Sequence, residues 1–141
     1  MDYDWSSGIP LSFMALCLLW AIVAEGLAFR KSRAINPWTP VSVLVLGMLQ
    51  VYWLGWHLVG PAQEDPATYT PDQKSQYATY LALFAFMFLP IMIMMFRHLQ
   101  RTRLHVGVAI SLFRLIPCAG VSFMFFRHLL MASEFMSRMA L

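Results

Sequence analysis

Two charged side chains stand inside otherwise apolar stretches of the sequence, Glu25 in "LLWAIVAEGLAF" and Arg114 in "SLFRLIPC". A carboxylate in such surroundings can bind protons or cations in alternation, whereas a guanidinium beside it would neutralise it and join two helices. Three interpretations are open. The first is a structural ion pair between Glu25 and Arg114, or between Arg114 and a partner subunit. In the second, each side chain reaches the membrane surface by itself. The third is a proton or cation site at Glu25.

Side-chain direction favours the ion pair. If both residues lie on membrane-spanning helices, Glu25 is five residues from the end of its span at Arg30 and Arg114 is ten residues from the start of its span at Leu104. These counts place them about 7 Å and about 15 Å inside the same cytoplasmic boundary of the membrane. Side chains lean toward the N-terminus of their helix, so on antiparallel helices the two heads approach each other. Pro117 removes a backbone hydrogen bond and releases the carbonyl of Phe113 beside Arg114, which is consistent with a functional site and is also common in ordinary bundles, so the side-chain direction decides. We therefore expect a structural ion pair between Glu25 and Arg114, and no catalytic residue.

The proton-site interpretation is supported by a resemblance. The stretch "LCLLWAIVAEGLAF" resembles the first helix of the small multidrug resistance transporters, four-helix proteins in which a glutamate exchanges protons for cationic drugs. The resemblance implies that role for Glu25. It covers about a dozen residues of the chain, and the third apolar segment, "YATYLALFAFMFLPIMIMMF", has no glycine-rich packing stretch like that of the family.

A second polar group follows one face of the stretch "LGMLQVYWLGWHLVG". Gln50 and His57 recur there at helical spacing with Trp53 on the border, which aligns an amide, an indole and an imidazole. By the expected topology, Arg127 and His128 lie at a similar depth. These five residues are a candidate pocket for a quinone or a lipid, and His57 with His128 could ligate a single haem b. Edge histidines more often face solvent, so we assign no cofactor to the chain by itself.

The remaining chemistry-bearing residues predict no metal site and no soluble-type enzyme. Cys17 and Cys118 lie in apolar segments without CxxC or Cys/His spacing, which is typical of inert thiols. No phosphate loop, nucleophile elbow or metalloprotease signature is present. We expect a chain that is not an enzyme on its own, although it could belong to an enzyme complex.

Composition indicates which elements position these residues. Of 141 residues, 60% are hydrophobic and only 12% charged, which is typical of an integral membrane protein. Four segments have the roughly 20 apolar residues that a membrane span requires, at about 9–29, 38–59, 77–96 and 104–126. The predicted fold is a single all-α domain with four transmembrane helices in an antiparallel bundle, followed by an amphipathic helical extension at 127–141.

The distribution of basic residues predicts the topology. Six of the ten lysines and arginines lie in the two connectors "RKSRAINPW" and "RHLQRTRLH", whereas the long connector between the second and third segments is acidic. The positive-inside rule places the basic connectors in the cytoplasm and both termini on the non-cytoplasmic side. The formal net charge of +3 is thus a topology signal, and we expect no nucleic-acid partner.

These observations predict a small accessory subunit of a larger membrane complex. Two buried charges, no complete cofactor site and large Phe and Met surfaces favour a chain that packs against other transmembrane subunits and lipids. An energy-transducing or electron-transfer complex, with this chain bordering a quinone or lipid site, is our leading expectation. The alternatives are a small homo-oligomeric proton-coupled transporter that uses Glu25, and a single haem b membrane anchor.

Overall fold

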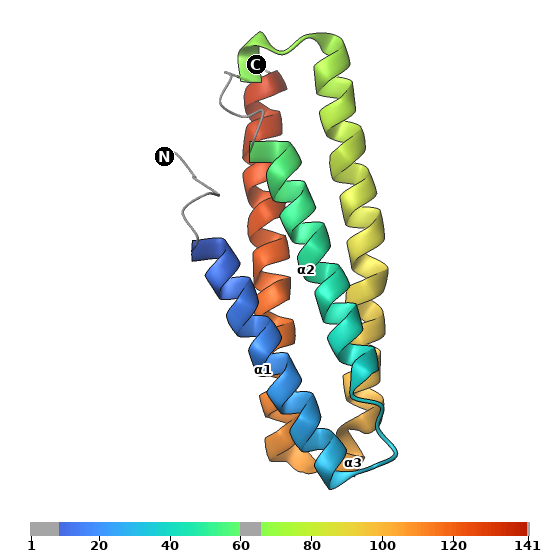
Figure 1. The fold of residues 1–141 in the computed structure, drawn as a ribbon. Coiled ribbons are helices and arrows are strands. Elements are labelled where there is room, and N and C mark those ends of the chain that lie inside the picture. Colours follow the sequence, from blue (N-terminus) through green and yellow to red (C-terminus); the bar gives the residue numbers. More distant parts are fainter. Residues whose placement is uncertain (1–8, 60–65, 141) are drawn as a thin grey trace.

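The computed structural model describes residues 9–59 and 66–140, with side chains at 11–53 and 67–138. This part of the chain is helical (Figure 1), with α1 at Ile9–Lys31, α2 at Trp38–Val59, a short 3-10 helix, η3, at Pro66–Thr68, and α3 at Pro71–Ala140. The all-α class predicted from the sequence is confirmed. α3 is 70 residues long, so it is the element that organises the fold.

Capping residues explain where the helices begin. The backbone N–H of Trp38 donates to Asn36 Oδ1 over 3.0 Å at the start of α2. At the start of α3, the Thr70 hydroxyl accepts from the Gln73 N–H at 3.3 Å, while Gln73 Oε1 accepts from the Thr70 N–H at 2.9 Å. This reciprocal pair is a capping box, which satisfies two backbone donors that a helix start otherwise leaves unpaired.

The prediction of four transmembrane helices is wrong, because the described chain has three helices, two of them long and apolar. Residues 77–126, predicted as two spans with a connector at 97–103, all belong to α3. The expected connector has no glycine or proline and stays helical. The chain reverses instead at Gly107, whose φ of 83° and ψ of 172° lie in a region that glycine alone adopts without strain.

The bend divides α3 into a first limb, residues 71–106, and a second limb, residues 108–140, which run side by side in Figure 1. Aromatic side chains join the limbs, and the rings of Phe88 and Phe125 stack with centroids 4.0 Å apart. Residues 127–138 continue the second limb, where Phe135 packs against Tyr69 and Tyr77. The predicted extension is therefore helical and lies against the start of α3.

α1 and α2 pack against α3 and complete the core. The core residues are apolar side chains from all three helices, among them Cys17, Ala21, Leu44, Met48, Val51, Phe84, Phe88, Met95, Val121 and Phe125. Gly120 has no Cβ, and one placed there would lie 2.9 Å from Cys17 Sγ. The glycine therefore allows α1 to approach the second limb closely.

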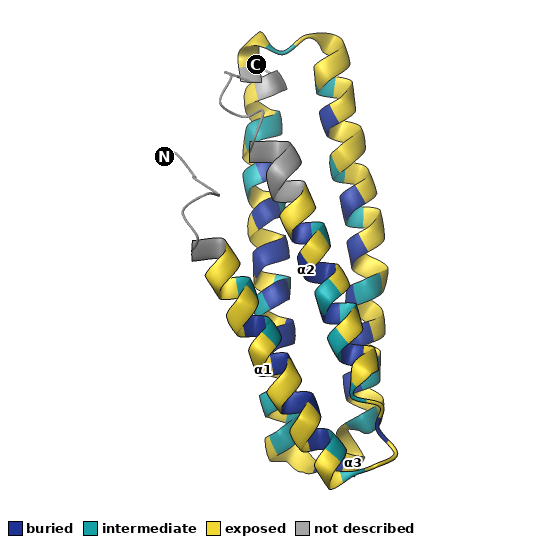
Figure 2. Cartoon of the chain, viewed as in Figure 1, coloured by how far each residue is buried: buried dark blue, intermediate teal, exposed yellow. Residues whose placement is uncertain are grey.

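Much of the outer face of the helices is exposed (Figure 2), and many of the exposed residues are large and apolar. Leu104, Val108 and Phe86 are 76–86% exposed, which is unusual for large side chains of a protein surrounded by water. Two helical stretches are long and apolar enough to cross a membrane, Leu11–Lys31 and Pro71–Arg138, and Trp38–Trp53 is a shorter apolar stretch. These properties fit a membrane protein.

Candidate functional site

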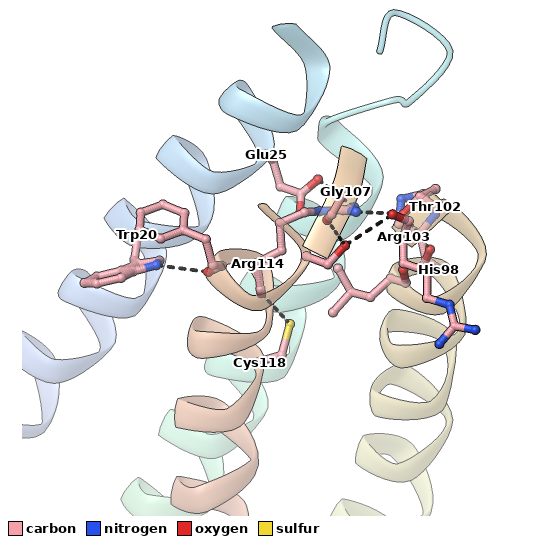
Figure 3. Close-up of polar contacts among 11 residues, drawn as sticks. Trp20, Glu25, His98, Thr102, Arg103, Gly107, Arg114 and Cys118 are labelled. Atoms are coloured by element: carbon pink, nitrogen blue, oxygen red, sulfur yellow. Dashed lines mark hydrogen bonds and ion pairs between the residues drawn. The ribbon is translucent and has the colours of Figure 1, made fainter. Parts of the chain in front are cut away.

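Glu25 and Arg114 meet in the interior near the bent end of the molecule (Figure 3). Arg114 donates from Nε to Glu25 Oε1 over 2.7 Å and from Nη2 to Glu25 Oε2 over 3.1 Å. Only 4% of Glu25 and 1% of Arg114 is exposed. A two-point contact of this kind uses both carboxylate oxygens and fixes the plane of the guanidinium. The structure therefore brings together the two residues that the sequence singles out.

The third nitrogen of the guanidinium, Nη1, reaches the first limb of α3. Arg114 Nη1 donates to Thr102 Oγ1 over 2.7 Å, and the Thr102 hydroxyl donates to the backbone carbonyl of His98 over 2.9 Å. Because Glu25 belongs to α1 and Arg114 to the second limb, the chain of hydrogen bonds joins three stretches of helix. We call Glu25, Arg114 and Thr102 the polar cluster.

The position of the bend explains why the two charged heads meet at one depth. Glu25 lies six residues before the end of α1 at Lys31, and Arg114 lies seven residues after Gly107. At about 1.5 Å per residue, these separations are about 9 and 10 Å. The difference in depth that the sequence predicts is therefore smaller, because the reversal occurs three residues later than the predicted span boundary at Leu104.

The side chain of Trp20 binds the backbone carbonyl of Phe113, which has no donor within the helix because Pro117 lacks an N–H. Trp20 Nε1 donates to the Phe113 carbonyl oxygen over 3.1 Å, and the Trp20 and Phe113 rings lie 4.9 Å apart. An unpaired carbonyl in an apolar environment is costly, so this bond stabilises both the proline position and the contact of α1 with α3. Trp20 lies beside Arg114 of the polar cluster in Figure 3.

The chemistry of the polar cluster is that of a closed charge pair. Both Glu25 oxygens accept hydrogen bonds from Arg114, so the charge that would attract a proton or cation is already neutralised within the chain. The described residues contain no group of three or more His, Cys, Asp or Glu side chains that could hold a metal ion. Cys17 and Cys118 are buried free thiols. The arrangement is suited to holding helices together.

The five residues predicted to form a quinone or lipid pocket belong to two elements of the structure, α2 and the second limb of α3. Gln50 and Trp53 line a shallow hollow between α2 and the first limb of α3. Arg127 and His128 lie on the second limb, where His128 is buried with Nδ1 2.7 Å from the Met124 carbonyl oxygen. The side chain of His57 lies outside the described residues. Quinone, lipid and haem b binding by this set stay predictions.

The sequence reasoning did not single out Thr102 or Trp20. Thr102 lies in "RHLQRTRLH", which the charge pattern indicates to be a connector, so its position opposite Arg114 was not expected. Trp20 was one of many aromatic residues in apolar stretches. The signal that could have found Trp20 is the carbonyl freed by Pro117, since a buried acceptor requires a donor from a neighbouring helix.

Comparison of the chain with protein-family models, with curated proteins and with solved structures finds no match.

Proposed function

We propose that the protein is a small non-catalytic accessory subunit of a larger membrane complex, and that its polar cluster holds the subunit in shape. The supporting observation is the closed pair of Glu25 and Arg114, in which each buried charge neutralises the other. A carboxylate that carries protons or cations has to be accessible in at least one state. Here it is engaged on both oxygens by a guanidinium of the same chain.

The proposed location is the membrane, with the bent end of the molecule in the cytoplasm. Arg30 and Lys31 are the last residues of α1 at that end and Arg33 follows them, while Arg101 and Arg103 precede the bend. Figure 1 places the α1–α2 connector and the bend together, while α1 begins and α3 finishes toward the opposite end. By the positive-inside rule, the chain is multi-pass with both termini on the non-cytoplasmic side.

The exposed apolar surface supports a partner. Transmembrane helices associate through close packing and interhelical hydrogen bonds, and large exposed side chains on every helix offer area for both lipids and partner helices. That the complex belongs to the energy-transducing or electron-transfer class stays a prediction from the sequence. The residues of the polar cluster do not distinguish among classes of complex.

Purification of the tagged protein from its native membranes in mild detergent tests the proposal. A stoichiometric set of other membrane proteins that remains through size-exclusion chromatography supports an accessory subunit. A homodimer without other proteins contradicts it and favours the transporter alternative. In that case, unchanged transport in Glu25→Gln would exclude Glu25 as the carrier, and loss of transport by Glu25→Gln protein that is still expressed and helical would establish the alternative.

A further inference from the structure

A hollow on the side of the molecule lies outside the polar cluster. It lies between α2 and the first limb of α3, and we call it the lateral groove. Its lining residues are Leu46, Leu49, Gln50, Tyr52, Trp53, Phe84 and Met87. At the edge of the groove, the rings of Trp53 and Tyr80 meet edge to face at 5.7 Å and connect the two helices.

Gln50 places an amide in this largely apolar groove, beside the amphipathic rings of Tyr52 and Trp53, and one atom of the amide is unsatisfied. Gln50 Oε1 is buried and has no hydrogen-bond partner among the described residues. In water the amide could turn outward and be hydrated, but hydrocarbon offers no donor. In the membrane, the donor for Oε1 has to come from another molecule. Rotation of the Gln50 amide about its terminal bond would turn Oε1 into the groove, where such a donor can reach it.

The position of Gln50 along α2 restricts which molecules can supply that donor. Gln50 follows Trp38, the first residue of α2, by twelve residues and precedes Val59, the last, by nine, which correspond to about 18 and 14 Å along the helix axis. The hydrocarbon core is about 30 Å thick, so a 22-residue α2 that crosses the membrane would place Gln50 near its middle. Lipid hydroxyls and head groups lie at the surface of the bilayer, whereas the side chains of a transmembrane helix are present at every depth.

The spacing of the lining residues also fits a helix. Leu46, Leu49, Gln50 and Trp53 recur at three- and four-residue intervals, so they form one ridge of α2. Phe84 and Met87 form a second ridge on α3, three residues apart. Helices pack by inserting their side-chain ridges into grooves between such ridges.

We propose that the lateral groove seats one transmembrane helix of a partner subunit, which donates a hydrogen bond from a Ser, Thr, Asn or Gln side chain to Gln50. This inference rests on the proposed function, since it names the surface through which the accessory subunit joins its complex. Polar side chains that bond across helices are a recognised source of affinity and register in membranes.

Site-specific photocrosslinking in native membranes tests this assignment. A benzophenone amino acid replaces Leu49 in the groove or, as the matched control, Leu19 on α1, because the two side chains are 58% and 59% exposed. We expect Leu49, and not Leu19, to give an adduct with one transmembrane helix of a co-purifying subunit. Gln50→Leu should lower the yield at Leu49 about three- to tenfold, in keeping with the loss of one interhelical hydrogen bond.

The facing residue completes the test. Replacement of the mapped Ser, Thr, Asn or Gln of the partner helix by an apolar residue should lower the yield as much as Gln50→Leu does, and both changes together should add little. The helical circular dichroism of the isolated Gln50→Leu protein should be unchanged, which separates loss of binding from loss of folding.

The remaining outcomes overturn the inference in distinguishable ways. If the complex co-purifies but Leu49 gives no adduct, or if Gln50→Leu leaves the yield unchanged, the proposed function stands and the groove assignment is wrong. If Leu49 crosslinks to a second copy of this chain, to a lipid or to a quinone, the occupant is different from the one proposed. If no stoichiometric partner co-purifies, the proposed function itself fails.

Discussion

Removing one charge of the Glu25–Arg114 pair should destabilise the protein far more than removing both. In Glu25→Gln the guanidinium keeps its charge and its bond to Thr102 but loses the carboxylate that neutralises it, in a site where Arg114 is 1% exposed. Breaking a buried pair in this way costs about 3–5 kcal/mol of the free energy of unfolding. In the double variant Glu25→Gln with Arg114→Met no unpaired charge remains, and the loss should be clearly smaller than the sum of the two single losses.

The assay is reversible unfolding of the purified protein in mixed detergent micelles, followed by helical circular dichroism. The chain contains a matched control, since Arg138 Nη2 donates to Glu134 Oε1 over 2.8 Å while both side chains are about two-thirds exposed. The same substitutions there, Glu134→Gln and Arg138→Met, should each change the free energy of unfolding by about 0.5 kcal/mol or less. The comparison of the two double-mutant cycles isolates the effect of burial.

A coupling free energy at the buried pair no larger than that at the surface pair would refute this reasoning. It would mean that Arg114 finds another counter-charge or solvent when Glu25 is neutral, so that the pair does not hold the helices. Loss of expression of Glu25→Gln, together with rescue by the double variant, would instead support the reasoning in cells, because the second substitution restores no attractive contact and only removes the unpaired charge.

Three further predictions concern neighbouring positions. Gly107→Ala should lower the free energy of unfolding by about 1–3 kcal/mol because alanine strains the backbone at φ of 83°, whereas Gly26→Ala, in open space on α1, should be neutral or slightly stabilising in the same unfolding assay. Thr102→Val should lower the free energy of unfolding by about 1.5–3 kcal/mol through loss of a bond to a charged donor, and Thr102→Ser should restore most of it. Trp20→Phe should lower the free energy of unfolding by about 1 kcal/mol through loss of the bond to the Phe113 carbonyl. In a Pro117→Ala background the loss should be smaller, because the alanine N–H can donate to that carbonyl. Equal losses in the two backgrounds would contradict this account.

The sequence predicts the helical class and the approach of Glu25 to Arg114 because both follow from local rules. Apolar stretches of about 20 residues favour helices, and the lean of side chains toward the helix N-terminus brings the charges of antiparallel helices together. The same rules miss Thr102, because its role depends on how the limbs of α3 face each other across the bend. That arrangement is set by packing, such as the stack of Phe88 on Phe125.

The number of helices does not follow from the distribution of charge, because a cluster of basic residues is not by itself a sign that the chain reverses. A cluster of arginines marks where a chain leaves the membrane, but it does not end a helix, since arginine is a good helix former. A reversal requires backbone angles that few residues adopt, and Gly107 supplies them four residues after the last arginine of the cluster, Arg103. A glycine near a predicted boundary is therefore better evidence for the turn than the charges are.

The bend and the polar cluster depend on each other, and this dependence has a measurable consequence. Thr102 lies five residues before Gly107 and Arg114 seven residues after it, so their bond of 2.7 Å forms only when α3 reverses as it does here. The bond in turn holds the limbs in register beside α1. The effects of Gly107→Ala and Thr102→Val on the free energy of unfolding should therefore be non-additive, and the double variant should be less destabilised than the sum of the two single variants. Alanine at 107 strains the bend, and the bend can relax by opening the bond between Thr102 and Arg114. In the double variant valine has already removed that bond, so the relaxation costs nothing further. Additive losses would show that the reversal is fixed by the aromatic stack between the limbs and not by the charge pair.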